Sequence, residues 1–422
     1  MAPNPSIMRA VEQLGYRITV GDVATQVGLN VGQANQGLLA LASDAGGHLQ
    51  VADTGDIVYL FPKNFRDVLR DKYFKLKLQE WWNKIWGILF YIIRISFGIF
   101  LVVSIALITI AIFLIIAAMS NRDNGGGGGG GGNWGSSGGS FFYFPDFWWF
   151  FNPNYDTHYR EQRREKRELN FFEAVFSFLF GDGNPNANLE ERRWQEIATV
   201  ISENRGAVVA EQISPYLDNI GEKYQQEYED YMLPTLTRFN GQPQVSQSGE
   251  IVYYFPELQV SAVKKRRHAI ASYLEEFKWK FSAADSGQIM LSAGLGIANF
   301  VGALILGNLL RGGVVAAKLG GLVGFVQSIY WLLLAYGTGF LVIPLIRYFW
   351  IQWRNTKITE RNSQRISRAK LLSNISQELQ NKINFAQQFA AQKFIGNENL
   401  AYSTETDLLD QEVKRLEQDN QD

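Results

Sequence analysis

Residues 47–62 read GHLQVADTGDIVYLFP, and residues 241–256 repeat the same phrase as GQPQVSQSGEIVYYFP. Both stretches alternate apolar and polar residues around a short turn, Gly55-Asp56 in the first copy and Ser248-Gly249 in the second. This alternation predicts a β-hairpin, because successive side chains of a strand point to opposite faces. The chain therefore contains a duplicated hairpin, and the sequence around each copy indicates the module to which it belongs.

Helical patterns precede each hairpin. In the first copy a helix is followed by a capping box at residues 19–22, a short helix that ends near Gly28, and a further helix at 31–43. This order of elements, closed by a hairpin at 49–61, is that of a winged helix-turn-helix. The second copy begins near Leu189 and carries an insertion at 215–231. The predicted fold class is α+β, mainly α, with two winged-helix-like modules.

Long apolar runs predict membrane spans. Residues 95–119 are almost uninterrupted in their apolar character, and at about 1.5 Å per residue they suffice for a hydrocarbon core of roughly 30 Å. Two further spans are expected at 289–310 and within 322–349. An alternative division into 314–336 and 340–353 would give four spans in total.

These patterns divide the 422 residues into six predicted segments. They are winged-helix-like module 1 at 1–66, an amphipathic helix and the first span at 67–120, a glycine-rich linker with an aromatic and basic segment at 121–188, winged-helix-like module 2 at 189–262, a basic helix with two or three spans at 263–353, and a helical tail with an acidic end at 354–422.

Tryptophan and basic residues flank the predicted spans, as is typical of the membrane–water interface. The predicted interface residues are Trp81, Trp82, Lys84, Trp86, Arg94, Lys264, Lys265, Arg266, Arg267 and Arg347. Arg94 is expected to extend its side chain to the interface rather than to act within the membrane. Lys318 is the better candidate for a functional charge in the membrane, although an ordinary lysine in a loop is the favoured interpretation. Basic flanks place both modules and the tail on the inner side. A single crossing between the modules contradicts this placement, and the sequence leaves the conflict open.

The composition argues against most chemistry within this chain. There is no cysteine, which excludes disulfides, thiolate catalysis and all-cysteine metal sites. The three histidines are far apart, and the glycine run at 125–132 lacks the Gly-Lys-Ser/Thr that completes a phosphate loop. The acidic pairs Glu275-Glu276 and Asp407 with Asp410 lie in charged stretches that are typical of solvated helices. We therefore expect no enzyme, and no catalytic, cofactor-binding or metal-binding residues.

The charge of the first module indicates which class of partner it can bind. DNA affinity depends on lysine and arginine contacts to phosphate, yet residues 18–62 contain neither and carry four aspartates. The sequence therefore disfavours nucleic acid and favours protein–protein docking. The predicted docking residues are Asp53, Asp56, Tyr59, Phe61, Glu250, Tyr253 and Phe255 of the hairpins, with Phe147, Trp148 and Trp149 of the aromatic run at 141–151.

The two Gly-(Asp/Glu)-Ile-Val-Tyr-(Leu/Tyr)-Phe-Pro phrases and the tail LAYSTETDLLDQE at 400–412 carry a family resemblance. The chain resembles a family of cyanobacterial and chloroplast membrane proteins whose plant members are labelled "iron–sulfur cluster biosynthesis family protein". The resemblance covers most of the chain outside the glycine linker, and it implies a thylakoid or plasma membrane of a cyanobacterium. Because this chain has no thiolate ligands, the resemblance implies a link to clusters only through a partner.

The function expected from these observations is that of an integral membrane scaffold or assembly factor. Its acidic winged-helix modules would dock unidentified proteins. Its spans, and the tryptophan and basic residues that flank them, would contact membrane lipids. Two alternatives stay open, a membrane-anchored regulator that binds nucleic acid and a small transporter or channel. Association between identical copies is also open.

Overall fold

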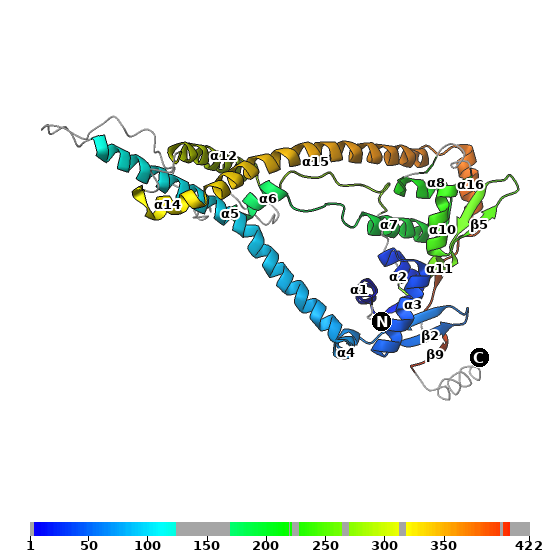
Figure 1. Ribbon diagram of the computed structural model, residues 1–422. Coiled ribbons are helices and arrows are strands. Elements are labelled where there is room, and N and C mark those ends of the chain that lie inside the picture. Colours follow the sequence, from blue (N-terminus) through cyan, green and yellow to red (C-terminus); the bar gives the residue numbers. More distant parts are fainter. Residues whose placement is uncertain are drawn as a thin grey trace, which may run out of the picture. The chain divides into compact units, whose positions relative to one another are not determined.

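The computed structural model describes residues 4–123, 169–218, 220–221, 228–263, 270–311, 318–396 and 400–405 (Figure 1). The described chain is mainly helical with small, mostly antiparallel sheets, which confirms the mainly α character expected from the sequence. It forms two compact units. Unit 1 comprises Met1–Gly87, Asn184–Trp279 and Gln352–Asp422, and unit 2 comprises Ile88–Gly183 and Lys280–Ile351.

The first module of unit 1 contains the first predicted hairpin. Its elements are α1 (Pro5–Leu14), β1 (Arg17–Thr19), α2 (Val20–Val27), α3 (Val31–Ala45), β2 (His48–Ala52) and β3 (Ile57–Leu60). β2 and β3 pair antiparallel with Val51 opposite Ile57, so the hairpin is confirmed. The capping box is confirmed as well, since the Asp22 amide donates to Thr19 Oγ1 and the Thr19 amide donates to the Asp22 carboxylate. β1 pairs with β3 on the side away from β2.

The second module repeats this strand order. Its elements are α7 (Leu189–Glu203), β4 (Ala207–Val208), α8 (Ala210–Ile213), the 3₁₀ turns η2 (Ser214–Tyr216) and η3 (Asp230–Met232), α10 (Leu233–Phe239), β5 (Gln242–Val245) and β6 (Ile251–Tyr254). β6 lies between β4 and β5, as β3 lies between β1 and β2. Val245 stands opposite Ile251 as Val51 stands opposite Ile57, so the two sheets share one register.

The two modules share one hydrophobic core within unit 1. Its buried residues come from both copies of the repeat, and α2 packs against α7 and against α11 (Pro256–Gln259). Polar contacts join the same elements, because Thr19 Oγ1 donates to the Val260 carbonyl at 3.1 Å and Arg238 Nε donates to the Gly28 carbonyl at 2.7 Å. The duplicated modules therefore form a single body.

The tail was predicted to be helical from 354 onward, and the structure corrects this prediction. α15 (Tyr330–Ser373) and α16 (Gln377–Gln387) are followed by two short strands, β8 (Lys393–Phe394) and β9 (Leu400–Ser403). β8 pairs with β7 (Val260–Ser261), and β9 lies beside β2 as a fourth strand of the first sheet (Figure 1). These strands form through partners distant in sequence, which a local helical pattern does not reveal.

The two modules protect their outer strands by different means. In the first sheet β9 covers β2, and the Thr404 amide donates to the Leu49 carbonyl at 2.9 Å. The shared register places Pro243 of β5 at the position of Leu49. Proline has no amide N–H to offer a further strand and is a common protection of exposed sheet edges.

α16 is held on the second module by a buried charged cluster. The Lys382 ammonium donates to Glu211 at 2.8 and 2.9 Å and also binds Glu229, which accepts a hydrogen bond from the Tyr253 hydroxyl. Buried charges that are paired in this way fix the relative placement of the elements that carry them. α16 is therefore part of the folded body of unit 1.

Unit 2 is built from long apolar helices. Its elements are the part of α5 (Phe74–Asp123) that follows Gly87, α6 (Phe171–Phe180), α12 (Ser286–Leu309), α14 (Gly321–Ser328) and the part of α15 that precedes Gln352. Three described stretches are long and apolar enough to cross a membrane, namely Lys84–Ser120, Ser286–Leu309 and Gly321–Ser373. The alternative with four spans is not found among the described residues, because α15 runs without a break through 337–339, where that alternative divides the chain.

One helix boundary differs from the prediction of an amphipathic helix that leads into the first span. α4 (Phe65–Lys72) ends at Tyr73, and α5 then contains both the tryptophan-rich stretch and the apolar run. The Tyr73 hydroxyl and the Lys72 ammonium both bind the Asp44 carboxylate on α3. These contacts hold the end of α4 against the first module. They account for the interruption of the helix between α4 and α5.

The packing in unit 2 gives the directions of its helices. Leu101 of α5 packs with Phe340 of α15 and with α6, whereas Ile115 packs with Leu306 of α12 and Leu333 of α15. α5 and α12 therefore run parallel, and α15 runs antiparallel to both. Gln288 Nε2, in the first turn of α12, donates to the Leu169 carbonyl at 2.8 Å. Asp123, at the end of α5, and Leu169 therefore lie toward opposite ends of the bundle.

Candidate functional site

A segment without regular secondary structure, residues 274–279, is held in unit 1 by three asparagine side chains. Asn362 pairs with the backbone N–H and C=O of Glu276, and Asn355 pairs in the same way with Trp279, at distances of 2.8–3.0 Å. Asn186 does the same for Phe277 at 2.7 and 2.8 Å. The three amides take the place of a neighbouring strand for this segment. Asn355 and Asn362 are seven residues apart and so lie on one face of α15.

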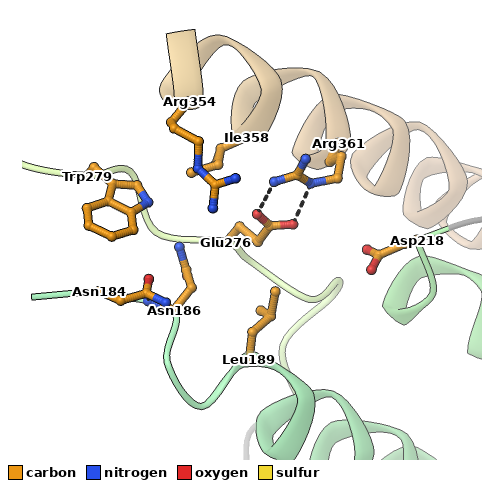
Figure 2. A pocket seen from close by; sticks show the side chains of 9 residues that line it. All are labelled: Asn184, Asn186, Leu189, Asp218, Glu276, Trp279, Arg354, Ile358 and Arg361. Atoms are coloured by element: carbon orange, nitrogen blue, oxygen red, sulfur yellow. Dashed lines mark hydrogen bonds and ion pairs between the residues drawn. The ribbon is translucent and has the colours of Figure 1, made fainter. Parts of the chain in front are cut away.

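This arrangement places Glu276 in a buried network of arginines. Arg361 binds its carboxylate through two hydrogen bonds of 2.8 and 2.6 Å (Figure 2). Arg365, whose side chain is 1% exposed, donates to Glu276 at 2.8 Å, and the Glu276 side chain is 5% exposed. Arg365 also binds Asp218, which binds Arg193 in turn. Paired geometry of this kind is what allows charges to be buried.

The electrostatic balance of the network favours ionised carboxylates. Burial by itself raises the pKa of Glu276 and of Asp218, because the charged form loses hydration. The arginine hydrogen bonds and charges outweigh burial, and the pKa of each carboxyl lies below its ordinary value. Both carboxylates are therefore charged at neutral pH.

A cavity of about 310 Å³ opens beside this network (Figure 2). It is lined by Asn184, Asn186, Leu189, Asp218, Glu276, Trp279, Arg354, Ile358 and Arg361. Arg354 and Arg361 extend from α15 on one side, and the asparagines lie on the opposite side. In the part of the chain that the structure describes, no group of three or more His, Cys, Asp or Glu side chains is placed to hold a metal ion. Polar recognition of a small ligand is the chemistry that this lining offers.

The predicted interface residues fall into three groups. Trp81, Trp82 and Trp86 on α5 are 57%, 58% and 53% exposed, and Lys84 is exposed beside them. The basic run Lys264, Lys265, Arg266 and Arg267 lies outside the described residues. Arg94 and Arg347 form the third group, and both contact protein groups of unit 2.

Arg94 and Arg347 fix the short helix α6 in unit 2. Arg94 binds Asp182 at 3.0 Å, and Asp182 accepts from the Ser177 hydroxyl at 2.6 Å. Arg347 donates to the carbonyls of Ser177 and Phe178 at 3.1 and 3.0 Å, in the last turn of α6, where a cation is favoured by the helix dipole. These arginines therefore have a structural role that the interface assignment did not include.

The predicted docking residues of the hairpins separate by burial. Asp53 is exposed, and Asp56 and Glu250 are partly exposed near the hairpin turns. Four residues of the set, Tyr59, Phe61, Tyr253 and Phe255, are buried in the shared core. The docking assignment of these four aromatic residues is corrected, because their side chains point into the body of unit 1. Phe147, Trp148 and Trp149 lie outside the described residues.

The sequence prediction missed the residues of the cavity. Arg354, Arg361 and Arg365 belong to the basic stretch that follows the last predicted span, and nothing in the sequence assigned them a site. Glu276 was interpreted as a solvated residue. A signal was present in the spacing of Asn355, Asn362 and the arginines, which recur at three, four and seven residues on α15. Such spacing places side chains on one helix face but does not identify the segment that they contact.

Comparison with known proteins identifies the family of the chain. No family model matches the chain, and no solved structure matches it. It is 36% identical over 424 residues to the Arabidopsis thaliana protein described as "Uncharacterized protein At5g03900, chloroplastic", with 98% of this chain and 80% of that protein covered. The resemblance to a family with chloroplast members is thereby confirmed, while the iron–sulfur label stays a prediction. The chain belongs to the family of this chloroplastic plant protein.

Proposed function

We propose that the protein is an integral membrane scaffold or assembly factor of a photosynthetic membrane, in which two winged-helix-like modules dock a protein partner. The observation that carries the proposal is the shared core of the two modules. A bilayer cannot pass through one hydrophobic core, so both hairpins face the same compartment. A platform of two fixed modules on a membrane anchor is the arrangement expected of a docking protein.

The strand order of each module supports the winged-helix interpretation. A helix, a short strand, two helices and a hairpin follow one another in the first copy, and the sheet order recurs in the second. The exposed face of α3, at the position of a recognition helix, carries Gln33, Gln36, Leu39 and Ser43. It has no cation to neutralise phosphate. This face and the acidic hairpin turns favour a basic protein surface over nucleic acid.

The three long apolar helices support integration into a membrane. α5 lies between the two modules in sequence, and a single crossing would separate them. The chain between the modules therefore crosses the bilayer an even number of times. Arg354, Lys357, Arg361 and Arg365 follow the apolar part of α15, and by the positive-inside rule they place unit 1 on the cytoplasmic or stromal side. An even number of crossings would remove the conflict between the basic flanks and a single crossing.

The chloroplastic relative supports a photosynthetic membrane, either thylakoid or plasma membrane in a cyanobacterium. The proposed action is binding rather than catalysis. Any connection with iron–sulfur clusters would run through the docked protein, because the chain contains no cysteine to ligate iron.

Charge reversal at the first hairpin tests the docking proposal. The double substitution Asp53→Lys with Asp56→Lys is expected to reduce the recovery of co-purified protein about tenfold after cross-linking in membranes, because it opposes a basic partner surface. The measurement is quantitative mass spectrometry of proteins purified with the tagged full-length chain.

The matched control is Asp67→Lys with Asp71→Lys on α4, which makes the same change in net charge away from the hairpin. Recovery should stay at the wild-type level in this control. Purification of lipid alone from the wild type, or equal loss in both variants, would contradict the proposal. Salt-sensitive retention of DNA by the wild type would favour the nucleic-acid alternative instead.

A further inference from the structure

A second cavity of unit 1, the α16 cavity, lies where the end of α7 meets α16. Its volume is about 480 Å³, within the range of about 300–1,000 Å³ that is usual for small-molecule sites. One wall is the turn that follows α7, and the other is the face of α16 that carries Ile383, Ala386 and Ala390. The ion pair of Lys382 with Glu211 fixes α16, and with it this wall, on the second module.

The internal repeat shows why there is space beside α16. Arg17 of β1 lies opposite Leu60. Ala207 of β4 lies opposite Tyr254, which is the equivalent of Leu60 in the shared register. In the first module the Arg17 side chain extends to the tail and donates to the Ile395 carbonyl at 2.7 Å. Ala207, which lines the α16 cavity, is too short for such a contact and leaves the space beside β4 open.

The same alignment places Arg205 where the first copy has Gly15. Both residues have a left-handed backbone, with φ of 56° and 90°. This conformation is ordinary for glycine but unfavourable for arginine. The Arg205 carbonyl accepts hydrogen bonds from the Ala391 amide at 3.0 Å and from the Gln259 side chain at 3.3 Å, which hold the turn in place. An arginine therefore stands where glycine would be less strained, and its side chain lines the cavity.

The free charges of the cavity are of opposite sign. Glu203 and Arg205 both line it, and within the described residues neither side chain has a hydrogen bond or an ion pair. The side-chain amide of Gln387 is free in the same part of the chain. Asn204 and Gln212, by contrast, bind each other at 3.2 Å. One free carboxylate and one free guanidinium suit a ligand that carries both an ammonium group and a carboxylate.

The helices that end at the cavity indicate where each charge of such a ligand would lie. α7 ends at Glu203 and α16 ends at Gln387, and the C-terminal end of a helix favours a positive charge. The ammonium group would therefore lie beside the Glu203 carboxylate. Arg205 presents several N–H donors in one plane, which match the two oxygens of a carboxylate. Ala207 and Ile383 supply apolar contact for the rest of the ligand.

We propose that the α16 cavity binds a small zwitterion of the α-amino-acid class with an apolar side chain. Arg205 is the donor to its carboxylate, and Glu203 is the acceptor from its ammonium group. The ligand would bridge the turn after α7 and the helix α16, so its binding would hold α16 more firmly on the second module. The site is separate from the hairpin surface proposed for docking and does not depend on the membrane location of the protein.

The test measures binding of L-leucine, L-valine and L-methionine to the detergent-solubilised full-length chain by calorimetry. The deaminated and the decarboxylated analogues of each amino acid are the matched ligands, because each lacks one of the two charges. Arg205→Gln and Glu203→Gln each remove one proposed partner. Lys370→Gln and Glu360→Gln remove the same charges at exposed positions of α15 that do not line the cavity.

The wild type and the two α15 variants are expected to bind at least one of the amino acids. Each cavity variant should bind it about tenfold more weakly, because one charge-assisted hydrogen bond is lost. The analogues should bind the wild type more weakly by a similar factor. Absence of binding of all three amino acids to the wild type would overturn the proposal. So would equal affinity in the cavity and α15 variants, or an analogue that binds as tightly as its parent.

Arg205→Gly separates a lost contact from a misfolded turn. Glycine fits the left-handed backbone, so this variant should unfold at the same urea concentration as the wild type or at a higher one. It should nevertheless bind the amino acid as weakly as Arg205→Gln. Hydrogen exchange of the α16 amides should slow when the amino acid is added to the wild type and should not change in Arg205→Gly. Tight binding by a folded Arg205→Gly, or unchanged exchange in the wild type, would also overturn the proposal.

Discussion

Replacement of Glu276 by glutamine is expected to lower the free energy of unfolding of unit 1 by about 3–5 kcal/mol, the range seen when one partner of a buried ion pair is removed. Arg361 and Arg365 would lose the carboxylate that they share, and Arg365 is almost completely buried. The amide keeps the size of the side chain, so the effect reports charge rather than a cavity. Urea unfolding of the detergent-solubilised chain, followed by tryptophan fluorescence, measures it.

The pH dependence gives this prediction a second readout. Because the pKa values of Glu276 and Asp218 are lowered on folding, the unfolded chain binds more protons at acid pH. The stabilisation is complete at neutral pH and is lost as the pH falls below about 4. The difference between wild type and Glu276→Gln should therefore shrink in acid. Glu250→Gln at the second hairpin turn is the control and should change stability by less than about 0.5 kcal/mol. If Glu276→Gln and the wild type unfold at the same urea concentration, the arginine–carboxylate network does not stabilise unit 1.

The second large effect is expected at Gly21 of α2. A β-carbon at this position would overlap the backbone carbonyl of Glu257 and would lie 3.2 Å from the carbonyl oxygen of Val260. Neither backbone group can turn aside as a flexible side chain can. Gly21→Ala should therefore separate α2 from α11 and destabilise unit 1 by about 3 kcal/mol, at the upper end of the range for overpacked sites. Urea unfolding and hydrogen exchange of the α2 amides measure this effect.

Gly87→Ala is the matched control for this steric prediction. Gly87 lies in α5, and a β-carbon added to it would meet no other atom within 4 Å. This variant should become slightly more stable, because alanine favours helix by about 1 kcal/mol over glycine. The same helical preference would act at Gly21. A loss of stability in Gly21→Ala would therefore report only the overlap with the Glu257 carbonyl. Wild-type stability of Gly21→Ala would mean that α2 and α11 do not meet as described.

The features that the sequence predicted correctly arise from local chemistry. The period of two around Gly55 and Ser248 indicated both hairpins, and the Thr19–Asp22 capping box depends on four consecutive residues. The length of the apolar runs indicated the three long helices. Each of these signals is contained in one stretch of chain.

The features that the sequence missed depend on partners far apart in the chain. β9 forms because Leu400–Ser403 lies beside β2, and no hairpin or helix signal marks that pairing. Tyr59 and Tyr253 were predicted to dock a partner, because the hairpin pattern did not show that both side chains are buried in a core shared by the two modules. The charge of Arg365 was visible, whereas its burial depends on Asp218 and Glu276 from another segment.

The candidate cavity was unpredictable for the same reason. Its walls come from residues 184–189, from Asp218, from residues 276–279 and from α15. Each contribution was interpreted as an ordinary solvated or flanking residue. Only the asparagine side chains that pair with the backbone of 276–279 bring these segments together.

Labelling of the two hairpin turns tests the central proposal most directly. The chain has no cysteine, so Thr54→Cys and Ser248→Cys each introduce a single thiol at an exposed position, and Arg311→Cys introduces one at the end of α12. A maleimide that cannot cross membranes is added to sealed vesicles of one orientation. Thr54→Cys and Ser248→Cys are expected to react alike, both labelled or both protected until the vesicles are opened, and Arg311→Cys is expected to show the opposite result. Labelling of one hairpin with protection of the other would contradict a single two-module body on one side of the membrane.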